Sequence, residues 1–239
     1  MPAGPPSEPP HRSAAAQVLV EHLDEPRLDD GALHHLRRVL RLRDGAEVCA
    51  ADGAGGWRST RFRGGADLET DGDVAHEPRP EPVLGVAFVP VKGDRPELVV
   101  QKLTEVGVDR ILVCTSERAV VRWEGERGDR HLERLGRVAR EASQQCRRLW
   151  LPEVAPATLA ELLGAGAVPA DLGGRPVAPT DRVLLVGPEG GWSDAERSAA
   201  ATAGASPVTL GPHVLRAETA AIAAGVLLVA TRAAAGPVI

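Results

Sequence analysis

Downstream of residue 82, short apolar runs alternate with longer amphipathic stretches, and this alternation constrains the fold more than any other feature of the chain. The apolar runs predict strands over 83–89, 111–115, 183–186 and 208–210. Helices are predicted over 94–106, 130–149 and 218–234, and from the capping box at 193–196 to Gly204. Such alternation is typical of an α/β domain in which helices cover a mainly parallel sheet.

The first part of the chain has a different pattern, which predicts a small, mainly β unit. Asp29 and Asp30 can cap a short helix, and strands are predicted over 47–51 and 57–62 with a turn between them. The apolar face of that helix would carry Leu33, Leu36 and Leu40. The stretch 77–82 is rich in proline and predicts a linker. The expected organisation is therefore a disordered tail over 1–14, a β unit over 15–78 and an α/β domain over 79–239.

Composition limits the classes of function. The chain has 239 residues and a net charge of −5, which argues against a strongly basic nucleic-acid binder, so RNA contacts would need local arginine clusters. Cys49, Cys114 and Cys146 are widely spaced and predict neither disulfides nor a zinc site, and no metal is expected. The longest apolar run, 219–230, is too short to span a membrane. These features predict a cytoplasmic protein without a membrane partner.

Two loops near the C-terminus are the best candidates for a ligand site. Each follows an apolar run and precedes a helix: the first is Gly187-Pro188-Glu189-Gly190-Gly191, the second runs from Leu210 to Ala220. Loops between a strand and a helix bind ligands because backbone N–H groups point outward there, so the two loops predict one pocket. The first loop lacks the lysine of a P-loop, and Glu189 would repel phosphate, so a cationic or neutral polar ligand fits better. A tight structural turn before a capped helix remains the alternative.

The second loop carries more chemistry. His213, Arg216, Glu218 and Thr219 lie within seven residues of one another. Glu218 and Thr219 suit the start of a helix, so a structural role is open for both. The positive charge of Arg216 opposes the helix dipole, so this side chain needs a partner: Glu218, Glu189 or a ligand.

With these motifs in view, the chain resembles the SPOUT-class methyltransferases, and more closely the family that methylates N3 of a uridine in 16S ribosomal RNA. Further blocks carry the resemblance in family order: residues 35–41, Gln101-Lys102 with 105–107, 116–118, and Glu141 with Gln145-Cys146 and Arg148. The resemblance implies a PUA-like β-barrel that helps to bind RNA. It also implies an α/β domain with a deep trefoil knot, and a homodimer whose active site lies near the subunit interface.

The resemblance further implies that S-adenosylmethionine binds against the two loops. The implied cofactor-binding residues are Val186, Gly187, Pro188, Glu189, Gly190, Gly191, Leu210, Gly211, His213, Val214, Leu215 and Thr219. Many relatives have arginine where this chain has His213, which leaves the role of that position open.

Arg216 and Glu218 are the expected catalytic residues. Arg216 would stabilise negative charge on the uracil or orient the base, and Glu218 would accept the N3 proton, directly or through water, or hold Arg216 in place. The expected RNA-binding residues are Arg37, Arg38, Arg41, Arg118, Arg147 and Arg148. The expected partner is 16S ribosomal RNA or the small ribosomal subunit. Two alternatives stay open: a SPOUT enzyme acting on another RNA or atom, and a non-catalytic assembly factor.

Overall fold

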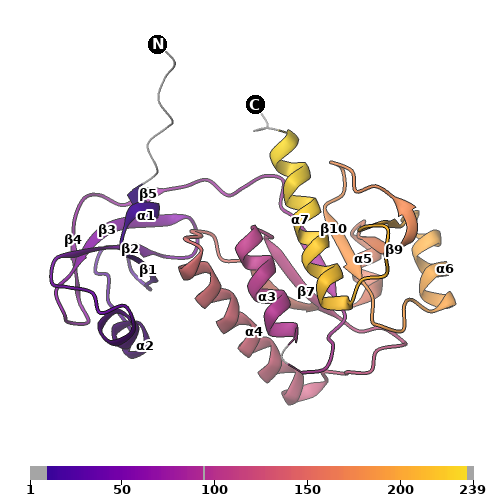
Figure 1. The fold of residues 1–239 in the computed structure, drawn as a ribbon, viewed down its shortest axis with the longest axis horizontal. Helices are drawn as coiled ribbons and strands as arrows, with labels where there is room; N and C mark the ends of the chain where they lie inside the picture. Colours follow the sequence, from indigo (N-terminus) through magenta and orange to yellow (C-terminus); the bar gives the residue numbers. More distant parts are fainter. Residues whose placement is uncertain (1–9, 94, 236–239) are drawn as a thin grey trace, which may run out of the picture. The chain divides into compact units, whose positions relative to one another are not determined.

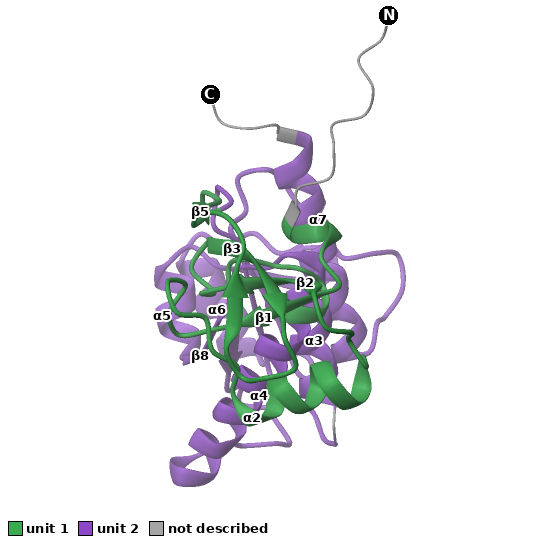
Figure 2. Cartoon of the chain, turned by 90° about the vertical axis from the view of Figure 1, so that its left-hand side faces the viewer, with its two compact units in different colours: residues 1–79, 143–151 green, residues 80–142, 152–239 purple. Residues whose placement is uncertain are grey.

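The computed structural model describes residues 10–93 and 95–235, which form two compact units. One unit comprises residues 1–79 and 143–151, and the other comprises residues 80–142 and 152–239 (Figure 2). The smaller unit therefore includes a short segment from the middle of the chain, which no sequence pattern had indicated.

The smaller unit is built on a five-stranded sheet with the order β1–β2–β3–β4, in which β5 also pairs with β3. Its strands are β1 (Ala16–Leu19), β2 (Ala46–Ala51), β3 (Gly56–Phe62), β4 (Leu68–Thr70) and β5 (Ala75–His76). β2 and β3 are antiparallel, which confirms the two predicted strands, and Gly53 in the turn between them has a φ of 77°. A side chain at that φ would be strained, so the turn favours glycine.

The predicted short helix forms, but its apolar face ends sooner than expected. The side chain of Asp29 accepts a hydrogen bond from the backbone N–H of Ala32 at 2.7 Å and caps α2 (Asp30–His34). The chain continues as a π-helical turn, η1 (His35–Val39), which buries Leu36 completely. Leu40 is 42% exposed, so its predicted place on the apolar face is wrong. The wider π turn, in which the Leu40 N–H donates to the His35 carbonyl, rotates this side chain away from the core.

Two segments at the edge of this unit differ from expectation. Residues 1–9 of the predicted disordered tail lie outside the described residues, whereas Pro10–Ser13 form a short helix, α1, in which His11 is buried. The segment 143–151 packs on β1, where Gln17 Nε2 donates to the Arg148 carbonyl at 2.8 Å. The N–H of Leu19 donates to Gln144 Oε1 at 3.1 Å. Long-range hydrogen bonds of this kind have no local sequence signature.

The larger unit contains a five-stranded parallel sheet with the order β8–β7–β6–β10–β9, as the alternating pattern predicted. Its strands are β6 (Gly85–Phe88), β7 (Arg110–Cys114), β8 (Glu153–Ala157), β9 (Val168–Arg175) and β10 (Val183–Val186). Alternate residues of the central strands face two separate cores, so Leu184 is buried on one side of β10 and Leu185 on the other. The trefoil knot stays a prediction.

Helices cover both faces of this sheet. α3 (Arg95–Val106), α4 (Gly125–Gln145) and α7 (Ala217–Ala235) supply Leu103, Leu135 and Leu228 to one core. α5 (Leu159–Gly164) and α6 (Asp194–Thr202) supply Leu162 and Ala200 to the other. Figure 1 shows α3 and α7 side by side on their face of the sheet, and the two helices are in extensive contact.

Two predicted elements need correction. The helix expected over 130–149 is α4, which begins and ends earlier, and Arg147 just beyond it has a left-handed φ of 62°. Val208 makes only isolated bridges, to Ala170 and Arg175, so 208–210 is not a strand. β9 contains Gly173 and Gly174, which are uncommon within strands, and it pairs with this segment only through these bridges rather than along a ladder.

α7 is longer than the apolar run that the sequence suggested. It is the one described helix that could cross a membrane by length and composition, over Ala217–Ala234. Ala221, Ala224 and Leu228 are nevertheless fully buried in the core beneath α3. The apolar character of this helix is therefore used, at least on one face, for packing within the unit.

Candidate active site

The carboxyl ends of β6, β7 and β10 lie at the same end of the sheet, where all three strands finish. The three strands are parallel, and Phe88 at the end of β6 is paired with Val186 on one side and with Val113 on the other. The loops that leave these strands lead to α3, α4 and α6. In open α/β sheets this edge is where ligands bind, so the first predicted loop lies where a ligand site is expected.

The glycines of the first loop have structural reasons to be glycine. Gly191 has a φ of 67°, and its N–H donates to the Pro188 carbonyl at 2.9 Å, which makes the loop a tight turn. A Cβ atom at Gly187 would lie 3.0 Å from the indole of Trp192, which is buried. The interpretation as a structural turn therefore holds for Gly187 and Gly191, and it does not conflict with a role in binding.

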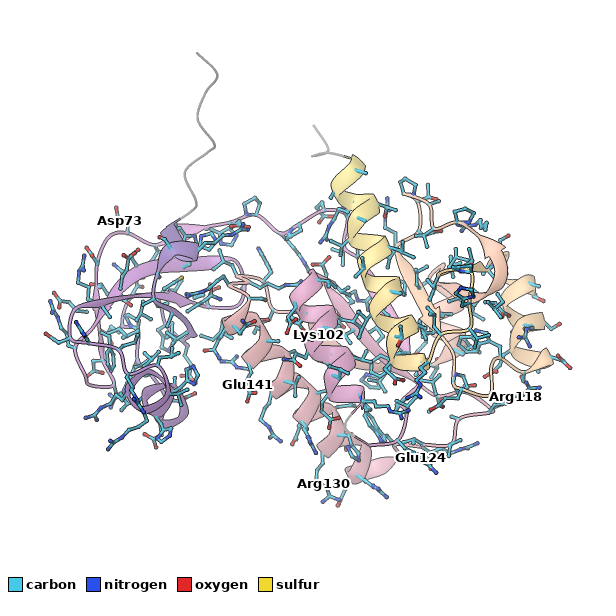
Figure 3. The ribbon with its side chains drawn as sticks, in the orientation of Figure 1. Asp73, Lys102, Arg118, Glu124, Arg130 and Glu141 are labelled. Atoms are coloured by element: carbon cyan, nitrogen blue, oxygen red, sulfur yellow. The ribbon has the colours of Figure 1, made fainter. Side chains whose placement is uncertain are left out.

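Arg118 connects the loop after β7 to the first loop. Its Nη1 donates to the Gly190 carbonyl at 3.2 Å, and Figure 3 labels this side chain in the loop after β7. The sequence suggested that Arg118 binds RNA; the structure places it against the glycine loop.

Glu196 holds the start of α6 and the loop after β7 together. Its carboxylate accepts hydrogen bonds from the backbone N–H groups of Ser193 at 2.7 Å and Glu117 at 2.9 Å, completing the predicted capping box. Burial alone would raise the pKa of Glu196, but these backbone hydrogen bonds hold it below its ordinary value. The ionised carboxylate is therefore the form that stabilises this edge of the sheet.

Glu196→Gln is expected to lower the free energy of unfolding at pH 7 by about 1–3 kcal/mol, because one charged acceptor is lost for two buried N–H donors. The folded-state pKa is depressed, so the contribution of Glu196 is present above the ordinary pKa of 4.5 and is lost as the pH falls through the folded-state value. Urea unfolding at pH 7 and at lower pH measures both effects. An unchanged difference between the two proteins across that range would contradict the assignment.

The second loop is anchored at its base by β9. The N–H of Thr209 donates to the Arg175 carbonyl at 2.8 Å, and the N–H of Arg175 donates to the Pro207 carbonyl at 3.0 Å. A Cβ atom at Gly174 would lie 2.5 Å from the backbone of Val208, so the two chains can approach this closely only at glycine.

Gly174→Ala is expected to displace 207–209 and thereby weaken binding of the cofactor that the family resemblance implies, S-adenosylmethionine, by at least about tenfold, a loss of about 1.4 kcal/mol. Isothermal titration measures the affinity. Gly136→Ala is the matched control, because its Cβ in α4 would meet no atom within 4 Å and alanine favours a helix. Equal cofactor affinity for both variants would show that this contact does not shape the second loop.

The bases of the two predicted loops meet in one core, but their tips differ in burial. Val186 belongs to the same apolar cluster against which Leu210 packs. Beyond it, His213 and Val214 are exposed, Val214 by 81%, and Gly211 has open space where a Cβ would be. Among the described residues, the N–H groups of 213–216 donate to no backbone carbonyl. The loop thus presents backbone N–H groups without a carbonyl partner next to the open space at Gly211.

Arg216 and Glu218 stand at the start of α7 but do not pair with each other. Arg216 is exposed and has no ion-pair partner within the described part of the chain. Glu218 is only 14% exposed, and its Oε1 lies 3.7 Å from Nε of Arg95, the first residue of α3. The interpretation in which Glu218 holds Arg216 in place is therefore not the arrangement seen.

Sequence reasoning missed Arg95, although a signal was present. Arg95 is a cation at the first residue of a helix, where it opposes the dipole, and this is the argument that singled out Arg216. Glu97, two residues later, pairs with Arg134 of α4 at 3.0 Å and was also missed.

The other expected RNA-binding residues lie in the smaller unit and fall into two groups. Arg37, Arg38 and Arg41 are exposed on and just after η1, as a phosphate contact requires. Arg147 Nη2 instead donates to the Ala14 carbonyl at 2.8 Å, and Arg148 Nε donates to the Trp150 carbonyl at 2.6 Å. Arg147 therefore helps to hold the segment 143–151 in its unit, whereas the Arg148 side chain makes a local bond within that segment.

Within residues 10–93 and 95–235, no three His, Cys, Asp or Glu side chains are grouped to hold a metal ion. Burial raises the pKa of the Cys49 and Cys114 thiols to about 12, so neither is a thiolate at neutral pH.

Two known protein families match parts of this chain. An RNA methyltransferase domain family matches residues 78–229, and an RNA methyltransferase PUA domain family matches residues 28–63. Proteins named Ribosomal RNA small subunit methyltransferase E are similar in sequence. The one from Synechocystis is 34% identical over 215 residues, or 81% of this chain and 69% of the relative. The one from Mycobacterium bovis is 34% identical over 216 residues, or 80% of each chain.

Solved structures agree as well. A methyltransferase of Legionella pneumophila in complex with SAM has a TM-score of 0.77 and 28% identity, covering 90% of this chain and 96% of its own. The Ribosomal RNA small subunit methyltransferase E of Neisseria gonorrhoeae, bound to S-adenosyl methionine, has a TM-score of 0.72 and 27% identity, covering 88% and 94%. These matches confirm the family and the fold recognised from the sequence blocks. The chain belongs to the RNA methyltransferase family that includes the proteins named Ribosomal RNA small subunit methyltransferase E.

Proposed function

We propose that this protein transfers a methyl group from S-adenosylmethionine to N3 of a uridine in 16S ribosomal RNA. The observation that carries the proposal is the position of Arg216 and Glu218 at the start of α7, where Glu218 lies beside Arg95 at the end of the sheet from which the glycine loop also extends. The names of the relatives support the RNA substrate, and the ligands of the Legionella and Neisseria structures support the cofactor.

The residues of both loops fit such a cofactor. When bound, S-adenosylmethionine supplies an electrophilic methyl group on a sulfonium sulfur. The exposed carboxylate of Glu189 suits a cationic ligand, the open position at Gly211 leaves space, and the free N–H groups of 213–216 offer donors. The proposed binding residues are those at 186–191, 210, 211, 213–215 and 219.

The chemistry assigned to Arg216 and Glu218 follows from the proton on N3 of uracil. That proton must leave before the nitrogen lone pair can form a bond to the methyl carbon. Glu218 would accept the proton, and the exposed guanidinium of Arg216 would stabilise the negative charge left on the uracil. Alignment of the two reactants would supply much of the remaining acceleration.

Two further features belong to the proposal. The exposed arginines at 37, 38 and 41 would contact phosphates, and the PUA family match over 28–63 supports RNA binding by this region. Exposed apolar side chains on α3 and α7, Leu98 at 41% and Val226 at 47%, suit the homodimer that the family resemblance implies.

Methyl transfer from labelled S-adenosylmethionine to small ribosomal subunits, and separately to naked 16S RNA, tests the function. We expect label in the RNA of at least one of these substrates. Label only in a different RNA would favour the first alternative, an enzyme with another target. No label together with no cofactor binding, followed through Trp192 fluorescence, would favour a non-catalytic assembly factor.

A further inference from the structure

The ion pair between Arg95 and Glu218 joins the first turns of two helices that are far apart in the sequence. Arg95 begins α3 directly after the loop from β6, and Glu218 is the second residue of α7. Arg95 Nε lies 3.7 Å from Glu218 Oε1, and the Arg95 side chain is 43% exposed. A cation at a helix N-terminus opposes the dipole, so its placement there requires an anion nearby. Glu218 supplies that anion.

Packing between the two helices keeps these residues together. Gly225 of α7 faces Leu103 of α3 so closely that a Cβ atom would lie 2.5 Å from Leu103 Cδ2. Ala221 and Ala224, one turn and two turns after Glu218, are fully buried. Small residues along this face of α7 let the helices approach, so the ion pair rests on a rigid base.

The two carboxylate oxygens of Glu218 have different surroundings. Oε1 faces Arg95, whereas Oε2 is buried and accepts no hydrogen bond from any described residue. A buried acceptor without a donor costs about 1–3 kcal/mol, so it needs an explanation in function. Arg95 donates no hydrogen bond to Oε2. Arg216 makes no ion pair with any described residue, Glu218 included.

We propose that Arg95 is a positioning residue, which holds the Glu218 carboxylate through Oε1 so that Oε2 accepts the N3 proton of the target uracil. The inference rests on the proposed function and extends it by one residue and one oxygen atom. Arg95 does not touch the base in this account. The two arginines thus have separate roles: Arg95 orients the carboxylate of Glu218, and Arg216 stabilises the uracil anion.

A positioning role predicts a loss in the chemical step rather than in binding. Arg95→Ala should lower kcat at least about tenfold, which is a part of what a general base contributes, and leave the KM for S-adenosylmethionine within about twofold. Arg95→Lys retains the charge and should recover most of kcat, although the planar fork is lost. In a protein already carrying Glu218→Gln, adding Arg95→Ala should cause no further loss, because the group that Arg95 positions is gone.

Arg110→Ala is the matched control. Arg110 pairs with Glu153 at 2.9 Å and is 39% exposed, close to the exposure of Arg95, but it lies at the start of β7, on the opposite edge of the sheet. Thermal unfolding of Arg95→Ala, Arg95→Lys and Arg110→Ala shows whether a loss of kcat reflects a loss of folding. We expect the Tm of Arg95→Ala to match that of Arg110→Ala.

These measurements test the positioning role of Arg95 separately from the proposed methylation of N3. An unchanged kcat in Arg95→Ala, a raised KM alone, or full multiplicative losses in the double variant would overturn the positioning role. Nucleoside analysis of the wild-type product tests the proposed function independently. Methylation at another atom would overturn that function, while a kcat loss restored by lysine would still support the pairing of Arg95 with Glu218.

Discussion

Arg216→Ala and Glu218→Gln are each expected to lower kcat by about 100-fold or more, because general-base and electrostatic terms of this kind are each worth about two orders of magnitude. Cofactor affinity should change little in either variant. Glu218 is 14% exposed beside Arg95, and glutamine keeps its shape while removing its capacity to take a proton. Arg216 is exposed without an ion-pair partner among the described residues, so its removal leaves no buried charge behind.

Steady-state methyl transfer and a cofactor titration measure the two quantities separately. Glu105→Gln is a suitable control for the carboxylate, since Glu105 is also partly buried and paired, at 2.7 Å to Lys102, but lies in the last turn of α3. Turnover that stays at the wild-type level in both Arg216→Ala and Glu218→Gln would refute the catalytic assignment. A loss of cofactor binding instead would move these residues to the cofactor site.

Arg232→Ala is expected to lower the free energy of unfolding by about 3–5 kcal/mol, because it strands a buried carboxylate. Arg232 Nη1 lies 2.6 Å from Asp109 Oδ2, and Asp109 is only 2% exposed. Arg232 also donates to the carbonyls of Gly107 at 2.9 Å and Pro82 at 3.2 Å. One side chain thus connects the C-terminal end of α7 to the segments that lead into β6 and β7.

Urea unfolding of this variant should be compared with Arg110→Ala, where a surface pair is broken and a loss below about 1 kcal/mol is expected. Asp109→Asn added to Arg232→Ala should recover part of the loss, because the uncompensated charge is removed while the amide can still accept from the Leu84 N–H, now at 3.0 Å from Oδ2. A loss below about 1 kcal/mol for Arg232→Ala would mean that water reaches Asp109 when the arginine is absent.

Much of the parallel sheet could be predicted because its central strands are buried on both faces. β6, β7 and β10 are continuous apolar runs in the sequence. The start of α6 is indicated by the capping box of Ser193 and Glu196. The region 150–182 gave no such signal. β8 contains Pro156 and β9 contains Gly173 and Gly174, residues that are uncommon within strands, so their place at the two edges of the sheet depends on tertiary contacts.

The candidate site was predictable in its loops and not in its pairings. Glycine, proline and polar residues between a strand and a helix can be recognised locally, and the structure places both loops on one apolar cluster. The partner of Glu218 could not be read from the sequence, because Arg95 is more than a hundred residues away and meets it only through the packing of α3 on α7. For Arg147, the hydrogen bond to the Ala14 carbonyl likewise comes from the long-range fold of the segment 143–151.

Identification of the methylated nucleoside is the most direct test of the central claim. Small ribosomal subunits that lack the modification would be treated with this protein and labelled S-adenosylmethionine, and the RNA digested and analysed by mass spectrometry against nucleoside standards. The account predicts 3-methyluridine at a single position, absent from reactions with Glu218→Gln. A methyl group on a ribose oxygen, on a base carbon or on another base would contradict it.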